Sequence, residues 1–382
     1  MGSTLVITND FPPRQGGIET FVHALATRLP DVVVYTSHEE GDTAYDATLP
    51  FPVIRDTTRM LLPTGRATRR AVEIAGAHGC DRVWFGAAAP LALMAPALRE
   101  AGVRRVVATT HGHEIWWARL PGARSMMRRI GDGVDVVTYL GDYTRSRIEP
   151  ALGPRPLMSR LVPAVDARVY RPDAAAREAL RTRLGLRDRR VILCVARMVP
   201  RKGQDMLIRA MPLLRRAVPD AVLLLVGKGP DEARLRRLAR RHAPGAVRFA
   251  GGKPHTETPG YYAAADVFAM PCRTRKGGLE AEGLGIVFLE AAASGLPVVV
   301  GDSGGAPDTV LDGSTGTVVD GTDTAAVADA LTGLLVDPGR AAAMGAAGRA
   351  WARESWSWDA SARHLARLLT PGQTAVPTPD DE

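Results

Sequence analysis

Two glutamates in the second half of the chain bracket a glycine-rich loop and the start of a predicted helix. Glu282 and Glu290 are eight residues apart, and Gly283 and Gly285 between them let a ligand approach the backbone closely. The helix beginning near Ile286 offers unpaired N–H groups and a positive dipole end to an anion. Because carboxylates repel phosphate, we interpret the glutamates as hydrogen-bond acceptors for sugar hydroxyls beside the phosphate. The segment predicts a site for a phosphorylated sugar; the alternative is a pair of solvated glutamates.

Two cations follow an apolar run, Val191–Val195, that we expect to be a strand. Arg197 and Lys202 lie in the loop after it, so both can reach one diphosphate. Charge-assisted hydrogen bonds of this kind contribute about 1.5 to 3 kcal/mol each, and a helix N-terminus adds roughly 0.3 to 1 kcal/mol. The sequence contains no Asp-x-Asp pair that would hold a bridging metal ion. We therefore predict that a diphosphate leaving group is neutralised without magnesium; the alternative is a solvated basic loop.

The first half of the chain has two further candidate sites. Gly16 and Gly17 lie between the first predicted strand and its helix, where they can cradle a phosphate or simply form a tight turn. His111 comes first after the run Val106–Thr109 and is expected to point into a ligand cleft. His113 forms a His-x-His pair with it, but no third metal ligand clusters nearby, so we predict hydrogen bonding instead of zinc binding. His113 and Glu114 are expected to order the loop.

The order of apolar runs and helical patterns predicts two doubly wound α/β domains in succession. Ligands of such sheets bind beyond the carboxyl ends of the strands, so facing domains would place their loops across one cleft. We predict an N-terminal domain over 1–167, a C-terminal domain over 168–355, a helix over 356–370 that crosses back to the first domain, and a disordered tail over 371–382. The expected strands are Thr4–Thr8, Val32–Tyr35, Arg82–Phe85, Val106–Thr109, Val134–Tyr139, Val191–Val195, Val222–Val226, Val247–Phe249, Val267–Met270 and Val298–Val300.

Composition and net charge favour a water-soluble globular protein that binds a polyanion. The 382 residues are 46% hydrophobic and 24% charged, which is ordinary for a water-soluble globular protein. No basic segment followed by an apolar run begins the chain, so a cytoplasmic protein is expected. The net charge of +8 favours a polyanionic partner. Cys80, Cys194 and Cys272 are far apart in sequence, which predicts reduced, buried thiols.

Two segments mix apolar side chains with arginines. Ile115–Arg129 contains two tryptophans and four arginines, and Met60–Arg70 is similar in kind. Both suit a membrane surface, with apolar groups among the lipid headgroups and arginines on anionic lipid at roughly 1 kcal/mol each. An ordinary solvated helix face is the alternative.

Together these motifs resemble those of retaining family 4 glycosyltransferases with the GT-B architecture, over residues 4–370. The Glu282-to-Glu290 segment and Arg201-Lys-Gly-Gln-Asp205 are specific for the superfamily. The resemblance is narrower to the actinobacterial phosphatidylinositol mannosyltransferases of the PimB type, and its segments are Asn9–Ile18, Trp84–Leu93, Thr110–Glu114, Arg129–Gly133, Val199–Asp205 and Ala269–Arg275. It implies metal-independent transfer of mannose from GDP-mannose to the inositol 6-position of phosphatidylinositol monomannoside. The product would be the dimannoside, made by a peripheral protein at the inner face of the plasma membrane.

The resemblance also implies roles for single residues. Arg197 and Lys202 would stabilise the charge that develops on the leaving diphosphate, most strongly in the transition state. His111 would contact the transferred mannose, and no protein nucleophile is needed because the departing phosphate oxygen takes the acceptor's proton. The implied binding residues are Gly16, Gly17, Gly285, Ile286 and Val287 at the phosphates, Glu282 at mannose, Glu290 at ribose, Lys253 elsewhere on the donor, and Asp10 and His113 at the acceptor.

The sequence departs from the family pattern at two positions that are expected to face the acceptor. Glu19 stands where related mannosyltransferases often carry glutamine, and Leu140-Gly-Asp142 stands where they often carry a hydroxyl residue. A family 4 enzyme with another donor or acceptor is the main alternative.

Proteins of other classes fit less well. A nicotinamide oxidoreductase would need a third glycine where Phe288 follows Gly283-Leu-Gly285. A non-catalytic sugar-binding protein has no use for Arg197 and Lys202, and 5% aromatic residues are few for a nucleic-acid binder.

Overall fold

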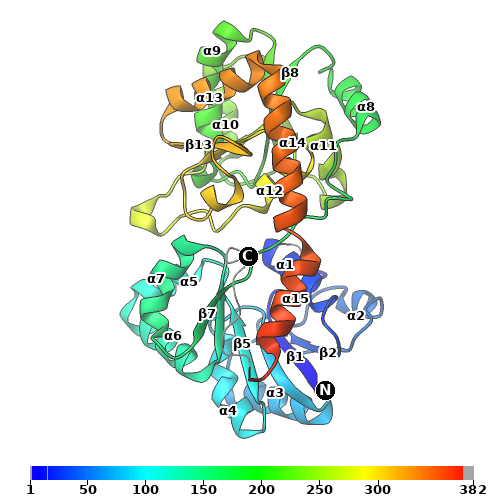
Figure 1. Cartoon of the computed structure of the whole chain (residues 1–382), viewed down its shortest axis with the longest axis vertical. Helices are drawn as coiled ribbons and strands as arrows, with labels where there is room; N and C mark the ends of the chain where they lie inside the picture. Colours follow the sequence, from blue (N-terminus) through cyan, green and yellow to red (C-terminus); the bar gives the residue numbers. More distant parts are fainter. Residues whose placement is uncertain (1, 15, 373–382) are drawn as a thin grey trace. The chain divides into compact units, whose positions relative to one another are not determined.

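The computed structural model describes residues 2–14 and 16–372, and the chain divides into two compact units (Figure 1). Unit 1 contains residues 1–163 and 358–382, and unit 2 contains residues 164–357. Unit 2 thus begins at Ala164, and α15 (Trp358–Leu369) at the end of the chain returns to unit 1. Of the expected tail over 371–382, residues 373–382 lie outside the described part.

In the described part of unit 1, seven parallel strands form one sheet in the order β3-β2-β1-β4-β5-β6-β7. The order reverses between β1 and β4, which makes their carboxyl ends the expected ligand-binding edge. The strands are β1 (Ser3–Thr8), β2 (Val32–Thr36), β3 (Val53–Arg55), β4 (Cys80–Phe85), β5 (Arg105–Thr109), β6 (Val136–Tyr139) and β7 (Leu157–Arg160).

Helices cover both faces of this sheet, so its central strands are apolar on both sides. In α1, Phe21, Val22 and Leu25 repeat at helical spacing and are buried against the sheet. The helices are α1 (Gly17–Ala26), α2 (Asp42–Asp46), α3 (Gly65–Ala77), η1 (Leu91–Met94), α4 (Ala95–Glu100), α5 (Glu114–Arg119), α6 (Pro121–Gly133), α7 (Asp142–Leu152) and α15 (Trp358–Leu369), of which η1 is a 3-10 helix.

Unit 2 repeats the design with six described parallel strands in the order β10-β9-β8-β11-β12-β13. Its order reverses between β8 and β11. Strand β9 is the run AVLLLV, buried along its whole length. The strands are β8 (Arg190–Val195), β9 (Ala221–Val226), β10 (Val247–Gly251), β11 (Val267–Met270), β12 (Val298–Gly301) and β13 (Gly316–Val319).

The helices of unit 2 flank its sheet in the same way (Figure 1). The α-helices are α8 (Ala174–Leu184), α9 (Gln204–Ala217), α10 (Glu232–His242), α11 (Thr258–Ala264), α12 (Ile286–Ala293), α13 (Thr324–Val336) and α14 (Pro338–Ser355). The 3-10 turns are η2 (Pro200–Lys202), η3 (His255–Glu257), η4 (Lys276–Gly278) and η5 (Pro307–Thr309).

The last helix, α15, packs on unit 1 although it follows unit 2 in the sequence. Leu365 and Leu368 are buried in the core that also contains Val6 and Val107. The Leu368 carbonyl accepts a hydrogen bond from Arg105 Nε at 2.8 Å. Figure 1 draws the helix in red beside α1. The predicted return of the C-terminal helix to the first domain is confirmed.

The predicted fold class is confirmed, and so is each predicted strand, with ends that differ by at most two residues. The strands that the sequence did not predict, β3, β7 and β13, all lie at sheet edges. Edge strands are paired on one side only, and these are short and partly exposed, so they carry no continuous apolar run.

The cysteines and the lengths of the helices can also be compared with the sequence-based expectations. The three cysteines are free and buried, as predicted. Among the described residues, no helix combines the length and apolarity needed to cross a bilayer.

The packing of α15 predicts that Leu365→Ala lowers the free energy of unfolding by about 2 to 5 kcal/mol, because it opens a cavity in a closed core. Arg363→Ala, on the exposed face of the same helix, is the matched control and should change it by less than about 0.5 kcal/mol. Denaturant titration of both variants measures the difference. Equal stability of the two variants would contradict the packing described for α15.

Candidate active site

The switch point of the second sheet collects the predicted donor residues. Arg197 and Lys202 follow β8, and Glu282 follows β11, its neighbour in the sheet. Because the carboxyl ends of adjacent parallel strands meet at one edge, these residues converge although about 80 positions separate Lys202 from Glu282 in the chain. The sequence predicted this group, and the geometry brings Lys202 and Glu282 into direct contact.

Lys202 and Glu282 form a mostly buried ion pair. Lys202 Nζ donates to Glu282 Oε2 at 2.7 Å, and their side chains are 13% and 8% exposed. Arg201 Nε lies 4.0 Å from the same oxygen. Arg197 is exposed, and among the described residues its guanidinium has no side-chain partner. One cation is thus held by a carboxylate, whereas the other is available to a ligand.

The backbone of Glu282 is fixed by a turn that follows β12. Ser303 Oγ accepts from the Glu282 N–H at 3.2 Å, and the Gly305 N–H donates to the Glu282 carbonyl at 3.0 Å. Gly304 has a φ of +62°, and a Cβ at this position would lie 1.9 Å from the Glu282 carbonyl oxygen. Only glycine allows the two loops to approach so closely, so this turn determines the position of Glu282.

The amino end of α12 has the geometry expected of an anion site. Gly285 precedes the helix with a φ of +91°, a conformation that favours glycine. A Cβ there would also lie 2.6 Å from the ring of Phe288. The first N–H groups of the helix, including those of Ile286 and Val287, have no partner within the helix and point along its positive dipole end.

Glu290, in the second turn of α12, is buried at 6% exposure. Tyr262 donates its phenol O–H to Glu290 Oε2 at 2.6 Å, and His255 Nδ1 lies 4.0 Å from Oε1. Burial raises the pKa of Glu290, whereas the hydrogen bond from Tyr262 opposes this shift. Lys253 lies in the loop before η3. Its Nζ is 3.9 Å from Glu257 Oε2 and lies over the aromatic ring of Tyr261.

In unit 1, His111 lies at the carboxyl end of β5. Its Nε2 is 2.7 Å from the carbonyl oxygen of Gly86, so Nε2 carries the proton in this contact and Nδ1 keeps its lone pair in the neutral ring. Burial lowers the pKa of His111, which favours the neutral form. Phe21 packs edge-on against the imidazole at 5.4 Å.

Glu114 orders the loop that carries His111. Its Oε2 accepts hydrogen bonds from the N–H groups of His111 and Gly112, both at 3.0 Å, and its side chain is fully buried. The loop-ordering role predicted for Glu114 is confirmed. His113 is more exposed, and its ring stacks on that of His111 at 6.5 Å.

The loop after β1 carries the remaining predicted residues. Gly16 precedes α1, and its carbonyl accepts from Thr20 N–H and Oγ1. A Cβ on Gly16 would lie 2.1 Å from Glu19 Oε2, whereas Gly17 has open space around it. Glu19 is buried and 3.2 Å from Arg14, and burial raises the pKa of its carboxyl. Asp10 interacts electrostatically with both Glu19 and His111.

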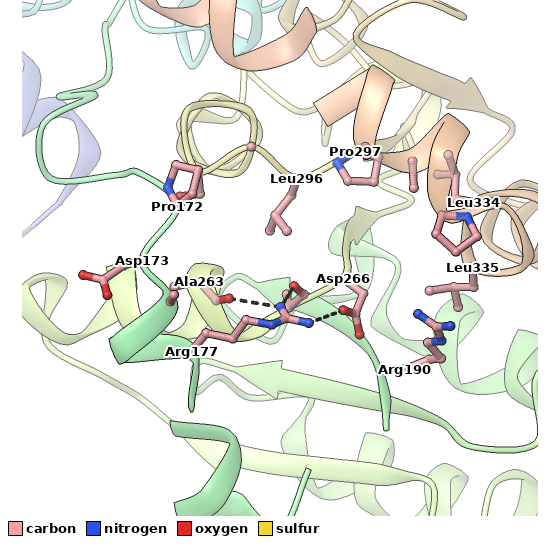
Figure 2. Close-up of a pocket in the computed structure, with 17 residues that line it drawn as sticks. Pro172, Asp173, Arg177, Arg190, Ala263, Asp266, Leu296, Pro297, Leu334 and Leu335 are labelled. Atoms are coloured by element: carbon pink, nitrogen blue, oxygen red, sulfur yellow. Dashed lines mark hydrogen bonds and ion pairs between the residues drawn. The ribbon is translucent and has the colours of Figure 1, made fainter. Parts of the chain in front are cut away.

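A cavity of about 410 Å³ lies at the opposite, amino-terminal edge of the second sheet (Figure 2). Arg190, Asp266 and Pro297, which line it, stand at the starts of β8, β11 and β12. Figure 2 shows Arg177 beside Asp266 and the Ala263 carbonyl, and its Nη2 donates to Asp266 at 2.5 Å. None of the predicted site residues lines this cavity, so we assign it no part in donor binding.

Within residues 2–14 and 16–372, no three His, Cys, Asp or Glu side chains are arranged to hold a metal ion.

Comparison with known proteins reveals the family. Residues 15–169 match the family described as Glycosyltransferase Family 4, and residues 176–351 match Glycosyl transferases group 1. A protein of Mycolicibacterium smegmatis is 52% identical over 96% of this chain and 98% of its own length. The chain belongs to glycosyltransferase family 4. It is accordingly a glycosyltransferase enzyme, as the sequence predicted.

Several relatives of this glycosyltransferase carry closely similar names. The M. smegmatis protein is named GDP-mannose-dependent alpha-(1-6)-phosphatidylinositol monomannoside mannosyltransferase, and so is a Mycobacterium tuberculosis protein that is 49% identical over 97% of this chain and 98% of its own length. A Corynebacterium glutamicum protein, 48% identical over 96% of this chain and 97% of its own length, is named as the enzyme for the monoacylated acceptor.

Solved structures show the same fold at low identity. Anabaena HepE in complex with UDP has a TM-score of 0.80 at 19% identity, covering 97% of this chain and 99% of its own. The lipopolysaccharide glycosyltransferase WaaG has a TM-score of 0.65 at 19% identity over 97% of this chain and all of its own.

Sequence reasoning missed residues that hold the predicted ones in place. Tyr262 and Tyr170 surround Glu290, and Ser303 and Gly304 hold Glu282. The pair Gly304-Gly305, shortly after the predicted strand Val298–Val300, was a signal of a close backbone contact. The tyrosines gave none, because a buried tyrosine is ordinary core.

The sequence predicts that Lys202 stabilises the charge developing on a leaving diphosphate, so Lys202→Ala should lower kcat about 10²- to 10³-fold. Steady-state kinetics and thermal unfolding of the variant test this. Lys276→Ala is the matched control, since it removes a lysine–glutamate pair from an exposed loop. A large loss of melting temperature with normal turnover would show that Lys202 acts only by pairing with Glu282.

Proposed function

We propose that this glycosyltransferase moves mannose from GDP-mannose to the inositol 6-position of phosphatidylinositol monomannoside, with retention at the anomeric carbon. The observation that carries the proposal is identity near 50% along almost the whole chain to relatives named for this reaction. A family 4 enzyme with another donor or acceptor is the alternative, and contacts to the nucleotide base would distinguish the donors. Lys253, in the loop after β10, is proposed to take part in donor binding.

Unit 2 supplies groups suited to holding the donor. The N–H groups at Gly285, Ile286 and Val287 can receive a phosphate, with Arg197 and Lys202 as its counter-ions. Glu282 would then accept hydrogen bonds from mannose hydroxyls. Since its Oε2 already accepts from Lys202, the same pair can link sugar recognition to charge on the leaving group.

The cations matter most as the bond to the anomeric carbon breaks. Negative charge then grows on the diphosphate, so fixed positive groups lower the barrier more than they strengthen ground-state binding. The departing phosphate oxygen takes the proton of the acceptor hydroxyl as that hydroxyl attacks from the same face. This step conserves the configuration of the sugar without a protein nucleophile.

Unit 1 supplies His111 for the transferred sugar. The imidazole is neutral at physiological pH because burial lowers its pKa, and its Nδ1 lone pair is available to a sugar hydroxyl. A neutral ring does not repel the positive charge that develops on the anomeric carbon. Gly16 and Gly17 are proposed to approach the diphosphate, and Asp10 and His113 to contact the acceptor.

Two exposed segments of unit 1 are proposed to bind the membrane surface on which a lipid acceptor resides. Every exposed large apolar side chain in the described part of unit 1 lies in Met60–Arg70 or Ile115–Arg129, namely Met60, Leu62, Trp116 and Leu120. Some arginines there are already paired, as Arg66 is with Asp56 and Arg128 with Asp132. We place the enzyme in the cytoplasm, peripherally bound to the inner face of the plasma membrane.

Calorimetric titration with GDP, UDP and ADP, in EDTA and without added metal, tests the donor. GDP should bind at least tenfold more tightly than the other two, because donor selectivity resides in base contacts while all three share the diphosphate. Tighter binding of UDP or ADP would leave the fold and the family intact but reject GDP-mannose as donor.

Binding to vesicles of phosphatidylglycerol and phosphatidylcholine tests the membrane surface. Affinity should fall as salt rises, because salt screens arginine–lipid attraction. Trp116→Ala should weaken binding, whereas Leu311→Ala, which removes an exposed leucine from unit 2, should not. Absent or salt-independent binding would reject the membrane proposal.

A further inference from the structure

One oxygen of Glu290 is held by a short hydrogen bond. Oε2 accepts from the Tyr262 phenol at 2.6 Å, whereas Oε1 lies 4.0 Å from His255 Nδ1, and the Tyr170 phenol also interacts with the carboxylate. The His255 side chain is 67% exposed, so it lies toward solvent and not in the core. The carboxylate is therefore held through Oε2 by a buried phenol, whereas Oε1 lies on the side of the exposed His255.

Tyr262 is itself held rigidly. It is fully buried in α11, its ring stacks on Phe268 at 5.7 Å, and Tyr170 packs edge-on against it at 5.5 Å. The Tyr170 phenol bonds to Thr258 Oγ1 at 2.9 Å and contacts His255 at 3.2 Å. A side chain packed on both faces cannot follow a moving carboxylate, so it fixes the direction of the hydrogen bond that it donates.

We propose that Tyr262 is a positioning residue for nucleotide recognition, holding Glu290 so that Oε1 meets the ribose hydroxyls of the donor. This inference rests on the proposed function, in which Glu290 binds the ribose. A carboxylate in one fixed orientation accepts the hydroxyl protons without first losing rotamer freedom, which strengthens binding. Tyr170 packs against Tyr262 and also interacts with the Glu290 carboxylate itself.

The same hydrogen bond favours the ionised form of Glu290. Burial raises the pKa of the Glu290 carboxyl, and the phenols of Tyr262 and Tyr170 and the nearby His255 lower it. Removal of the Tyr262 hydroxyl takes away the largest of these opposing contributions, so the pKa of Glu290 rises further. Because ribose recognition requires the ionised form, affinity would then be lost at a higher pH as the solution is acidified.

The test compares GDP with 2′,3′-dideoxy-GDP, which lacks both ribose hydroxyls, on the full-length protein. Wild type should favour GDP at least tenfold, since hydrogen bonds to a charged group are lost in the analogue. Tyr262→Phe, which keeps the ring and its packing, should weaken GDP about tenfold and the analogue less than about twofold. On acidification, the Tyr262→Phe variant should lose GDP affinity at a higher pH than the wild type does.

Two further variants make the comparison specific. Tyr261→Phe is the matched control: it removes a phenol from the neighbouring position of α11, keeps the ring beneath Lys253, and should leave both affinities unchanged. Glu290→Gln should remove most of the preference for GDP. In that background Tyr262→Phe should add little, because both changes disrupt one interaction.

Each contrary result has a distinct meaning. Equal weakening of GDP and the analogue in Tyr262→Phe, or no weakening, overturns the positioning role. A wild-type enzyme that does not distinguish the two nucleotides overturns it as well, by removing ribose recognition from Glu290. If UDP binds in place of GDP, the proposed donor fails, and the same comparison with UDP and its dideoxy analogue decides the role of Tyr262.

Discussion

The reversal of strand order in each parallel sheet is the constraint on which the rest of the structure depends. Parallel strands end at one edge, and where the order reverses, the loops on either side diverge and leave room for a ligand. In unit 2 this point lies between β8 and β11, and it receives Lys202 from one strand and Glu282 from the other. In unit 1 the loop after β1 carries Asp10 and Gly16 at the equivalent position.

Buried carboxylates near these edges are stabilised in different ways, and each way suits a different task. Glu282 pairs with a cation, so it is coupled to Lys202. Glu290 is held by neutral phenols, with Tyr262 donating to Oε2, so its orientation is fixed without a cation. Glu114 accepts two backbone N–H groups and acts only on its own loop. The partner of each carboxylate, more than its burial, decides its role.

Close backbone approach is the second device that positions the site. Gly304 allows the turn after β12 to touch the Glu282 carbonyl, and Gly285 allows the chain to enter α12 at a positive φ. Neither residue carries a side chain that could meet a substrate. Their contribution is geometric, because any Cβ would displace the loop that presents Glu282 or the helix that presents its N–H groups.

The sequence by itself determined the two-domain α/β fold, the central strands and the chemical character of the donor residues. Buried parallel strands need continuous apolar runs. A run such as Ala221–Val226 can be recognised in the sequence without knowledge of its neighbouring strands. The Gly-rich segment before α12 could also be recognised from the sequence. The residues that start a helix and those that bind phosphate are close together in the chain. The family motifs extended this to a family 4 glycosyltransferase.

Only the tertiary structure decided which residues support those that the sequence singled out. The edge strands β3, β7 and β13, the ion pair between Lys202 and Glu282, and the contact of Tyr262 with Glu290 all join segments that are distant along the chain or carry weak local patterns. A buried tyrosine has the same sequence signal whether its hydroxyl meets a carboxylate or only completes a core. That choice depends on which side chain the fold places opposite it, and local periodicity does not encode this.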